Sequence, residues 1–217
     1  MKRSRMSAAA ALEQLKEGNR RFVSNLRCVS TIASRATRES LLAGQTPFAI
    51  VLACSDSRAP AEIVFDVCLG DLFVIRVAGN ITAPSIIGSV EFAAAKFGTE
   101  LVVVMGHTHC GAIDATLERI ADPSSDSLSH HVDDIVMRIR PGILHLAESG
   151  EFQGEELANA AVEANVHASA KQLRRSAVLQ DLARNGLQIV EATYNLATGH
   201  VAFLDPLESS PSLPLAL

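Results

Sequence analysis

Apolar runs of strand length alternate with segments of helical spacing along this chain, and this alternation constrains the fold more than any other feature. The apolar runs predict four strands, at Phe48–Ala53, Leu72–Val77, Leu101–Met105 and Leu187–Val190. Segments between them space apolar residues three and four apart, which is typical of amphipathic helices. This pattern predicts an α/β fold with a mostly parallel central β-sheet flanked by helices.

Five helices and a closing hairpin complete the expected arrangement. The helices are expected at Ser7–Val23, at Ser85–Phe97, from near Cys110 to Ile120, at Glu155–Arg175 and in a short segment up to Arg184. Tyr194–His200 predicts a hairpin turn into a last strand at Val201–Leu204. No composition break or repeat divides the chain, so we predict a single domain over residues 1–217. Within it, 1–40 form an N-terminal helical arm and 206–217 a loose C-terminal tail.

Composition and charge exclude several classes of function. The chain has 217 residues and a formal net charge of −5, so it has no general electrostatic attraction to nucleic acid or anionic membranes. Aromatic residues make up 4% and Trp is absent, which argues against a base-stacking surface. No window approaches 18 uncharged apolar residues, and the basic start at Met1–Met6 is not followed by the apolar run of a secretory signal. We therefore expect a cytoplasmic protein, with Met6 as an alternative start.

Residues that can bind a metal follow two of the most apolar strands. Cys54 and Asp56 come directly after Phe48–Ala53, while His107 and Cys110 follow Leu101–Met105. Ligands of open α/β sheets bind beyond the carboxyl ends of the strands, so these side chains are expected to meet. Two thiolates, one imidazole and one carboxylate match the donor set that zinc prefers. The sequence therefore predicts one Zn²⁺ per chain.

Asp56 is the conditional member of this set. Four protein ligands would make a closed, structural zinc site, whereas a catalytic zinc keeps one position open. Arg58 lies two residues further on and can pair with the Asp56 carboxylate through two hydrogen bonds. If Arg58 holds the carboxylate away from the metal, water takes the fourth position and zinc lowers its pKa toward about 7.

Longer segments around these residues resemble one known family. The motifs CSDSR at Cys54–Arg58 and GHTHCG at Gly106–Gly111 closely resemble the two signatures of the β-class carbonic anhydrases. The segments LEQLKEGNRRFV, GQTPFAIVLACSDSR, GDLFVIRVAGN and YNLATGHVAFL are also similar to the family. Together they cover roughly Leu12 to Leu204. The resemblance implies zinc-dependent, reversible hydration of CO2 to bicarbonate and a proton by zinc-bound hydroxide.

The resemblance also implies roles for particular residues. Cys54, His107 and Cys110 match the permanent zinc ligands, and the pair Asp56–Arg58 matches the residues that gate the metal and orient its water. The expected substrate-binding residues are Gln45, as a hydrogen-bonding side chain, and Phe73, Ala78 and Phe92, which line a small apolar pocket. An apolar pocket suits CO2, which carries no net charge or dipole.

One departure from the family pattern bears on the subtype. Some bacterial members hold an inhibitory bicarbonate with a Trp three residues before the first ligand and an Arg. Here Val51 takes the Trp position, and Arg76 matches the Arg. We therefore expect an enzyme of the plant-like subtype. The resemblance also implies a homodimer or homotetramer in which the N-terminal helix packs on a partner subunit. The sequence alone shows that the apolar face of this helix needs a surface to cover it.

Two other functions share these ligands. A hydrolase of CS2 or COS would use the same fold and zinc site, and only the pocket would differ. A structural zinc module would keep Asp56 on the metal and would bind a partner protein without catalysis. Cys28 and Cys68 are interpreted as structural, and His130 and His131 as exposed loop residues. His109, beside Cys110, is not expected to be a ligand and is placed at the mouth of the cleft.

Overall fold

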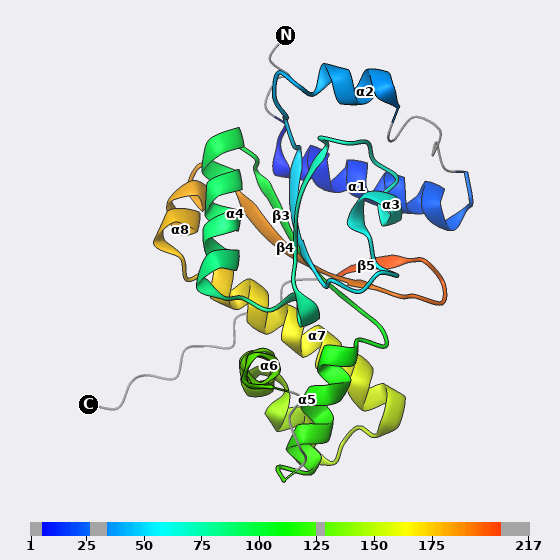
Figure 1. Ribbon diagram of the computed structural model, residues 1–217, viewed down its shortest axis with the longest axis vertical. Coiled ribbons are helices and arrows are strands. Elements are labelled where there is room, and N and C mark those ends of the chain that lie inside the picture. Colours follow the sequence, from blue (N-terminus) through cyan, green and yellow to red (C-terminus); the bar gives the residue numbers. More distant parts are fainter. Residues whose placement is uncertain (1–5, 27–33, 125–128, 205–217) are drawn as a thin grey trace.

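A central sheet of five strands organises the chain, as shown by a computed structural model that describes residues 6–26, 34–124 and 129–204 (Figure 1). The strand order is β2-β1-β3-β4-β5. The first four strands are parallel and β5 runs antiparallel to β4. Their bounds are β1 Ala49–Ala53, β2 Leu72–Arg76, β3 Leu101–His107, β4 Gln188–Tyr194 and β5 Val201–Leu204. The predicted α/β fold is confirmed.

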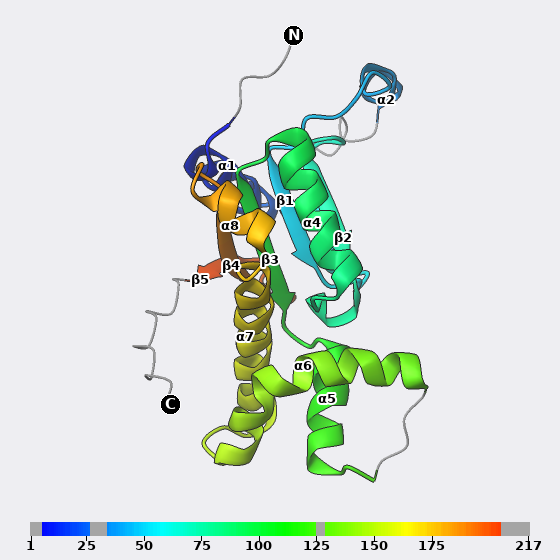
Figure 2. The ribbon, with the colours of Figure 1, turned by 90° about the vertical axis from the view of Figure 1, so that its left-hand side faces the viewer.

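Helices cover both faces of this sheet (Figures 1 and 2). One face packs against α1 (Ala8–Val23) and the short α3 (Ala61–Val64), and the other against α4 (Pro84–Phe97), α7 (Gly154–Leu173) and α8 (Ala177–Ala183). Figure 2 shows α5 (Gly111–Ala121) and α6 (His130–Ser149) beyond the ends of β1 and β3. The remaining helix, α2 (Arg35–Ser40), precedes β1. Every residue of β1 and β3 is buried, as expected for central strands of a covered parallel sheet.

The predicted strands are all present, but the sequence interpretation missed α2, α3 and the long helix α6. Pro141 inside α6 obscured the helical pattern because proline usually ends a helix. The signal was nevertheless there, since the buried residues Val136, Ile139 and Ile143 are three and four apart. His130 and His131, interpreted as loop residues, form the exposed first turn of this helix. The predicted tail at 206–217 and Cys28 lie outside the described residues.

Helix α1 buries its apolar face against its own chain, and its packing on a partner subunit stays a prediction. Ala8, Ala11 and Leu15 are buried in the core beneath the sheet. Asn19 is 3% exposed, and its amide Nδ2 donates to the carbonyls of Val64 and Gly199 at 3.1 and 2.9 Å. The apolar stripe that the sequence left without a surface is therefore satisfied inside the protomer.

Among the helices of the described residues, none is both long enough and apolar enough to span a membrane.

A pair of glycine substitutions tests the packing of α1. A Cβ added at Gly18 would stand 1.8 Å from the Phe65 carbonyl oxygen, whereas one added at Gly88 in α4 would meet nothing within 4 Å. We expect Gly18→Ala to lower the free energy of unfolding by about 1–3 kcal/mol, because the backbone of α1 or of Phe65 must move to make room for the methyl group. The matched Gly88→Ala should raise it by about 0.5–1 kcal/mol through helix propensity. Urea unfolding measures both, and equal effects of the two would contradict this packing.

Candidate metal centre

Neighbouring strand ends bring the predicted ligands together. β1 ends at Ala53, so Cys54 is the first residue beyond it, and β3 ends at His107. The two strands pair in parallel register with Ala53 opposite Met105, which places both ends at one edge of the sheet. Cys110 is the N-cap residue of α5, and its thiol returns toward the strand ends. Three of the four predicted donors therefore converge.

These three donor atoms form a compact, buried cluster. The ligand atoms of Cys54, His107 and Cys110 all lie within 4.8 Å of one another. The two sulfur atoms are 4.0 Å apart, close to the separation of about 3.8 Å for two thiolates on a tetrahedral zinc with Zn–S bonds of about 2.3 Å. The three residues are 5%, 1% and 3% exposed. No other such cluster of His, Cys, Asp or Glu occurs in the described part of the chain.

The His107 ring is oriented as a metal ligand. Its Nδ1 lies 2.9 Å from the carbonyl oxygen of Thr108, so Nδ1 carries the proton and donates it there. Nε2 is buried and has no hydrogen-bond partner among the described residues. A buried imidazole nitrogen without a partner is costly unless something occupies it. Its free lone pair, next to two thiols, fits a zinc ion.

The two thiols interact strongly with each other. The hydrogen bond from Cys110 lowers the pKa of Cys54 to about 4, assisted by the backbone amide of Gly79. The same contact with Cys54, together with burial, raises the pKa of Cys110. One thiolate is thus formed readily and the second requires a cation to replace the shared proton. Zinc supplies such a charge, because cysteine ligates it as thiolate.

Asp56 is held by Arg58 just outside this cluster. The guanidinium donates to both carboxylate oxygens, from Nε at 3.0 Å and from the terminal nitrogen at 2.7 Å, and the Arg58 amide donates at 2.8 Å. These bonds keep the pKa of the Asp56 carboxyl well below its usual range. Asp56 Oδ2 is 4.0 Å from His107 Nε2. Asp56 therefore borders the three donors without joining their cluster.

Two further residues hold the loop that carries Cys54 and Asp56. Arg76, at the end of β2, donates through its guanidinium to the backbone carbonyls of both residues, to that of Cys54 at 2.9 Å. The amide of Gly79 donates to Cys54 Sγ at 3.3 Å. Sequence interpretation missed Gly79, although its place just after β2 puts it at the same sheet edge. A three-residue turn at the end of a strand is the signal that could have found it.

The residues expected to line the substrate pocket divide into two groups. Ala78 belongs to the short 3-10 turn Ala78–Asn80, next to Cys54. Gln45 is exposed and precedes β1, so the length of that strand separates it from the ligands. Phe73 and Phe92 pack with ring centroids 6.3 Å apart, where Phe73 lies early in the edge strand β2. Within one protomer these three residues do not reach the metal centre.

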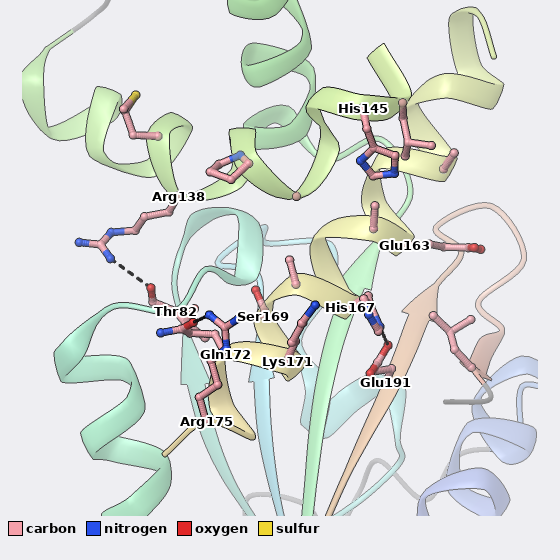
Figure 3. A pocket seen from close by; sticks show the side chains of 18 of the residues that line it. Thr82, Arg138, His145, Glu163, His167, Ser169, Lys171, Gln172, Arg175 and Glu191 are labelled. Atoms are coloured by element: carbon pink, nitrogen blue, oxygen red, sulfur yellow. Dashed lines mark hydrogen bonds and ion pairs between the residues drawn. The ribbon is translucent and has the colours of Figure 1, made fainter. Parts of the chain in front are cut away.

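A large cavity lies away from this cluster. It measures about 930 Å³, is bordered mainly by α6 and α7, and contains none of the predicted ligands (Figure 3). His167 lines it, and its Nδ1 is 3.2 Å from the buried carboxylate of Glu191. A smaller cavity of about 320 Å³ is bordered by Thr108, beside His107. Size alone would therefore misplace the site, which is recognised by its donor atoms.

Comparison with known proteins agrees with this geometry. The family described as Carbonic anhydrase matches residues 49–201. The chain belongs to the carbonic anhydrase family. It is 38% identical to the carbonic anhydrase 2 of Mycobacterium tuberculosis over 90% of this chain and 92% of that one. It is 40% identical to the carbonic anhydrase of Mycolicibacterium smegmatis, over 88% and 91%.

Solved structures place this carbonic anhydrase in the β class. A β-carbonic anhydrase of Aspergillus fumigatus superposes with a TM-score of 0.72 at 27% identity, over 92% of this chain and 91% of that one. A tetrameric β-carbonic anhydrase of Sordaria macrospora shares the fold with a TM-score of 0.69 at 24% identity, over 77% and 85%. The predicted family and activity are confirmed, and the Cys54–His107–Cys110 cluster is typical of the zinc site of this class.

Zinc content tests the ligand set directly. We expect one zinc per chain in the purified protein, and nearly complete loss after chelator dialysis in Cys110→Ser and His107→Ala, because each removes one of three buried donors. Cys68→Ser is the matched control, since Cys68 is a free cysteine outside the cluster. Metal analysis by mass spectrometry measures the ratio. Equal zinc loss in the control would contradict the assignment.

Proposed function

We propose that this carbonic anhydrase hydrates CO2 in the open form of its metal site, with Cys54, His107 and Cys110 as the protein ligands and Asp56 held off the metal by Arg58. The double hydrogen bond between the Arg58 guanidinium and both Asp56 oxygens is the observation that carries this proposal. A carboxylate whose two oxygens both accept hydrogen bonds from one guanidinium forms a strong charge-assisted pair, and this pairing competes with binding to the metal. The fourth metal position then stays available to solvent.

Zinc, when bound, supplies the Lewis acidity that produces a water-derived nucleophile near neutral pH. The chain supplies orientation. Asp56 Oδ2 lies 4.0 Å from His107 Nε2, so it stands beside the metal position and can accept a hydrogen bond from the attacking water. Arg58 also donates to the His109 carbonyl at 3.1 Å, which ties the gate to the loop before α5. The Asp56 carboxylate is thereby fixed as a hydrogen-bond acceptor that orients the water.

We further propose the plant-like subtype, in which no inhibitory bicarbonate is held beside the gate. Val51 is fully buried inside β1, so that position offers no polar or aromatic surface to an anion. Arg76 donates to two backbone carbonyls of the metal loop and is thereby engaged in holding it. Both observations support a site controlled by the Asp56–Arg58 pair alone.

The oligomer supplies the remaining pocket residues in this proposal. Gln45, Phe73 and Phe92 lie away from the metal centre of their own protomer, and Phe92 is 55% exposed on α4. An exposed aromatic side chain beside the edge strand β2 indicates an interface with a partner subunit. We infer a homodimer, or a homotetramer like the tetrameric Sordaria macrospora protein, in which these residues complete the pocket of a neighbouring subunit.

Substrate assays separate the proposed reaction from its alternatives. The zinc-loaded protein should hydrate CO2 at about pH 8.5, above the lowered pKa of the metal-bound water, as followed by stopped-flow with a pH indicator. It should hydrolyse COS and CS2 far more slowly. Small anions should inhibit it by competing for the open metal position. Faster turnover of COS or CS2 would make it a hydrolase on the same fold. No turnover of any of the three, without anion binding, would leave a structural zinc module.

The gate is tested by removing its guanidinium. Arg58→Ala frees the Asp56 carboxylate, so we expect kcat/KM for CO2 to fall roughly 10–100-fold while zinc content stays at the wild-type level. Arg184→Ala is the matched control, because it breaks an exposed Arg–Asp pair on α8 far from the metal centre. Unchanged kcat/KM in Arg58→Ala would show that the pair does not control the reaction.

A further inference from the structure

A short turn after β2 connects the metal centre to the helix behind it. This turn, Ala78–Asn80, presents the Gly79 amide to Cys54 Sγ at 3.3 Å. Gly79 has φ +68°, a conformation that L side chains rarely adopt, and a Cβ there would lie 2.7 Å from Ile139 Cδ1 and 3.0 Å from Ala112 Cβ, so this position favours glycine. A backbone N–H that faces a metal-binding sulfur lowers the electron density this sulfur donates to the metal. The position of the turn therefore matters to the metal.

Helix α7 holds that turn through two buried polar side chains. Asn165 Nδ2 donates to the Gly79 carbonyl at 2.8 Å, and Ser169 Oγ donates to the Asn80 carbonyl at 3.1 Å. Asn165 and Ser169 are 2% and 4% exposed and four residues apart, so they face the turn from one side of the helix. A buried amide among apolar side chains is costly unless it is hydrogen-bonded. Here that bond fixes the peptide that follows the Gly79 amide.

The same helix also contacts the other half of the metal centre. Gly106 precedes His107 in β3, and a Cβ there would lie 2.7 Å from Val166 Cγ2 and 2.9 Å from Val162 Cγ1. Val166 is next to Asn165 in α7. The close approach of α7 to β3 thus sets where Asn165 can reach. A single helix therefore fixes the position of the strand that carries His107 relative to the turn that donates to Cys54.

We propose that Asn165 is a positioning residue for the metal centre, because it fixes the turn whose Gly79 amide donates to Cys54 Sγ. Ser169 assists it on the next carbonyl. Neither side chain belongs to the three donors of the metal centre. Their effect reaches the zinc through one N–H···S hydrogen bond, which limits the electron donation from Cys54 and keeps the metal a strong Lewis acid. This inference rests on the proposed zinc site. It adds that two side chains of α7 influence the properties of that site.

Cobalt substitution and metal release test this role without any assay of CO2. In Asn165→Ala and in Asn165→Leu, which better keeps the volume, the thiolate-to-cobalt charge-transfer band should move to lower energy. Zinc release to a chelator should become roughly tenfold faster, because the turn that holds the Cys54 side of the site is then less firmly positioned; this size is typical for residues that orient metal ligands. Asn159→Ala, an amide deletion on the same helix, should leave the band and the release rate unchanged.

The result that overturns the proposal is an unchanged band and release rate in a folded Asn165 variant, as judged by its urea unfolding midpoint. If neither variant folds, Ser169→Ala removes a single hydroxyl, and a smaller shift in the same direction is expected. An unshifted charge-transfer band in Ser169→Ala would also overturn the proposal. A wild-type protein that binds cobalt but fails to hydrate CO2 would contradict the proposed reaction and leave this test intact.

Discussion

The parallel pairing of β1 with β3 is the constraint on which the metal centre depends. Cys54 follows one strand and His107 ends the other, so their separation is set by strand spacing rather than by any loop. The pairing is protected because every residue of both strands is buried. Cys110 then needs only a tight turn into α5 to complete the cluster, and the left-handed φ of +55° at His109 makes that turn. A rigid core thus positions ligands that come from two distant segments.

Glycine allows the surrounding layers to come close enough to support this core. Gly18 lets α1 rest on the Phe65 carbonyl, and Gly106 lets α7 rest on β3. A methyl group at Gly18 would clash with the Phe65 backbone, and one at Gly106 would clash with the Val162 and Val166 side chains of α7. The helix α7 that approaches at Gly106 is the one that carries Asn165 to the turn behind Cys54. In this region, the close packing of α7 on β3 therefore also positions the turn that donates to Cys54.

The strands and the three ligands could be predicted from sequence because both signals are local. A continuous apolar run predicts a buried strand, and donors at its carboxyl end predict a site. What could not be predicted depends on tertiary contacts: the surface that α1 covers, the bond from Asn165 to Gly79, and the distance of Phe92 from its own metal centre. No repeating pattern of residue types in the sequence signals any of these three features. The helix α6 is the intermediate case, since its buried spacing was readable but Pro141 obscured it.

Charge balance supports the proposed pairing of Asp56 with Arg58 in place of binding to the metal. Zinc carries two positive charges, and the thiolates of Cys54 and Cys110 neutralise both. A carboxylate as fourth ligand would leave a net negative charge in a site whose ligands are at most 5% exposed, and an uncompensated buried charge is costly. The guanidinium offers Asp56 a full positive charge with matched geometry at a more exposed position. In the proposed open form, the same two thiolates that would bind the metal thus help to keep its fourth position open.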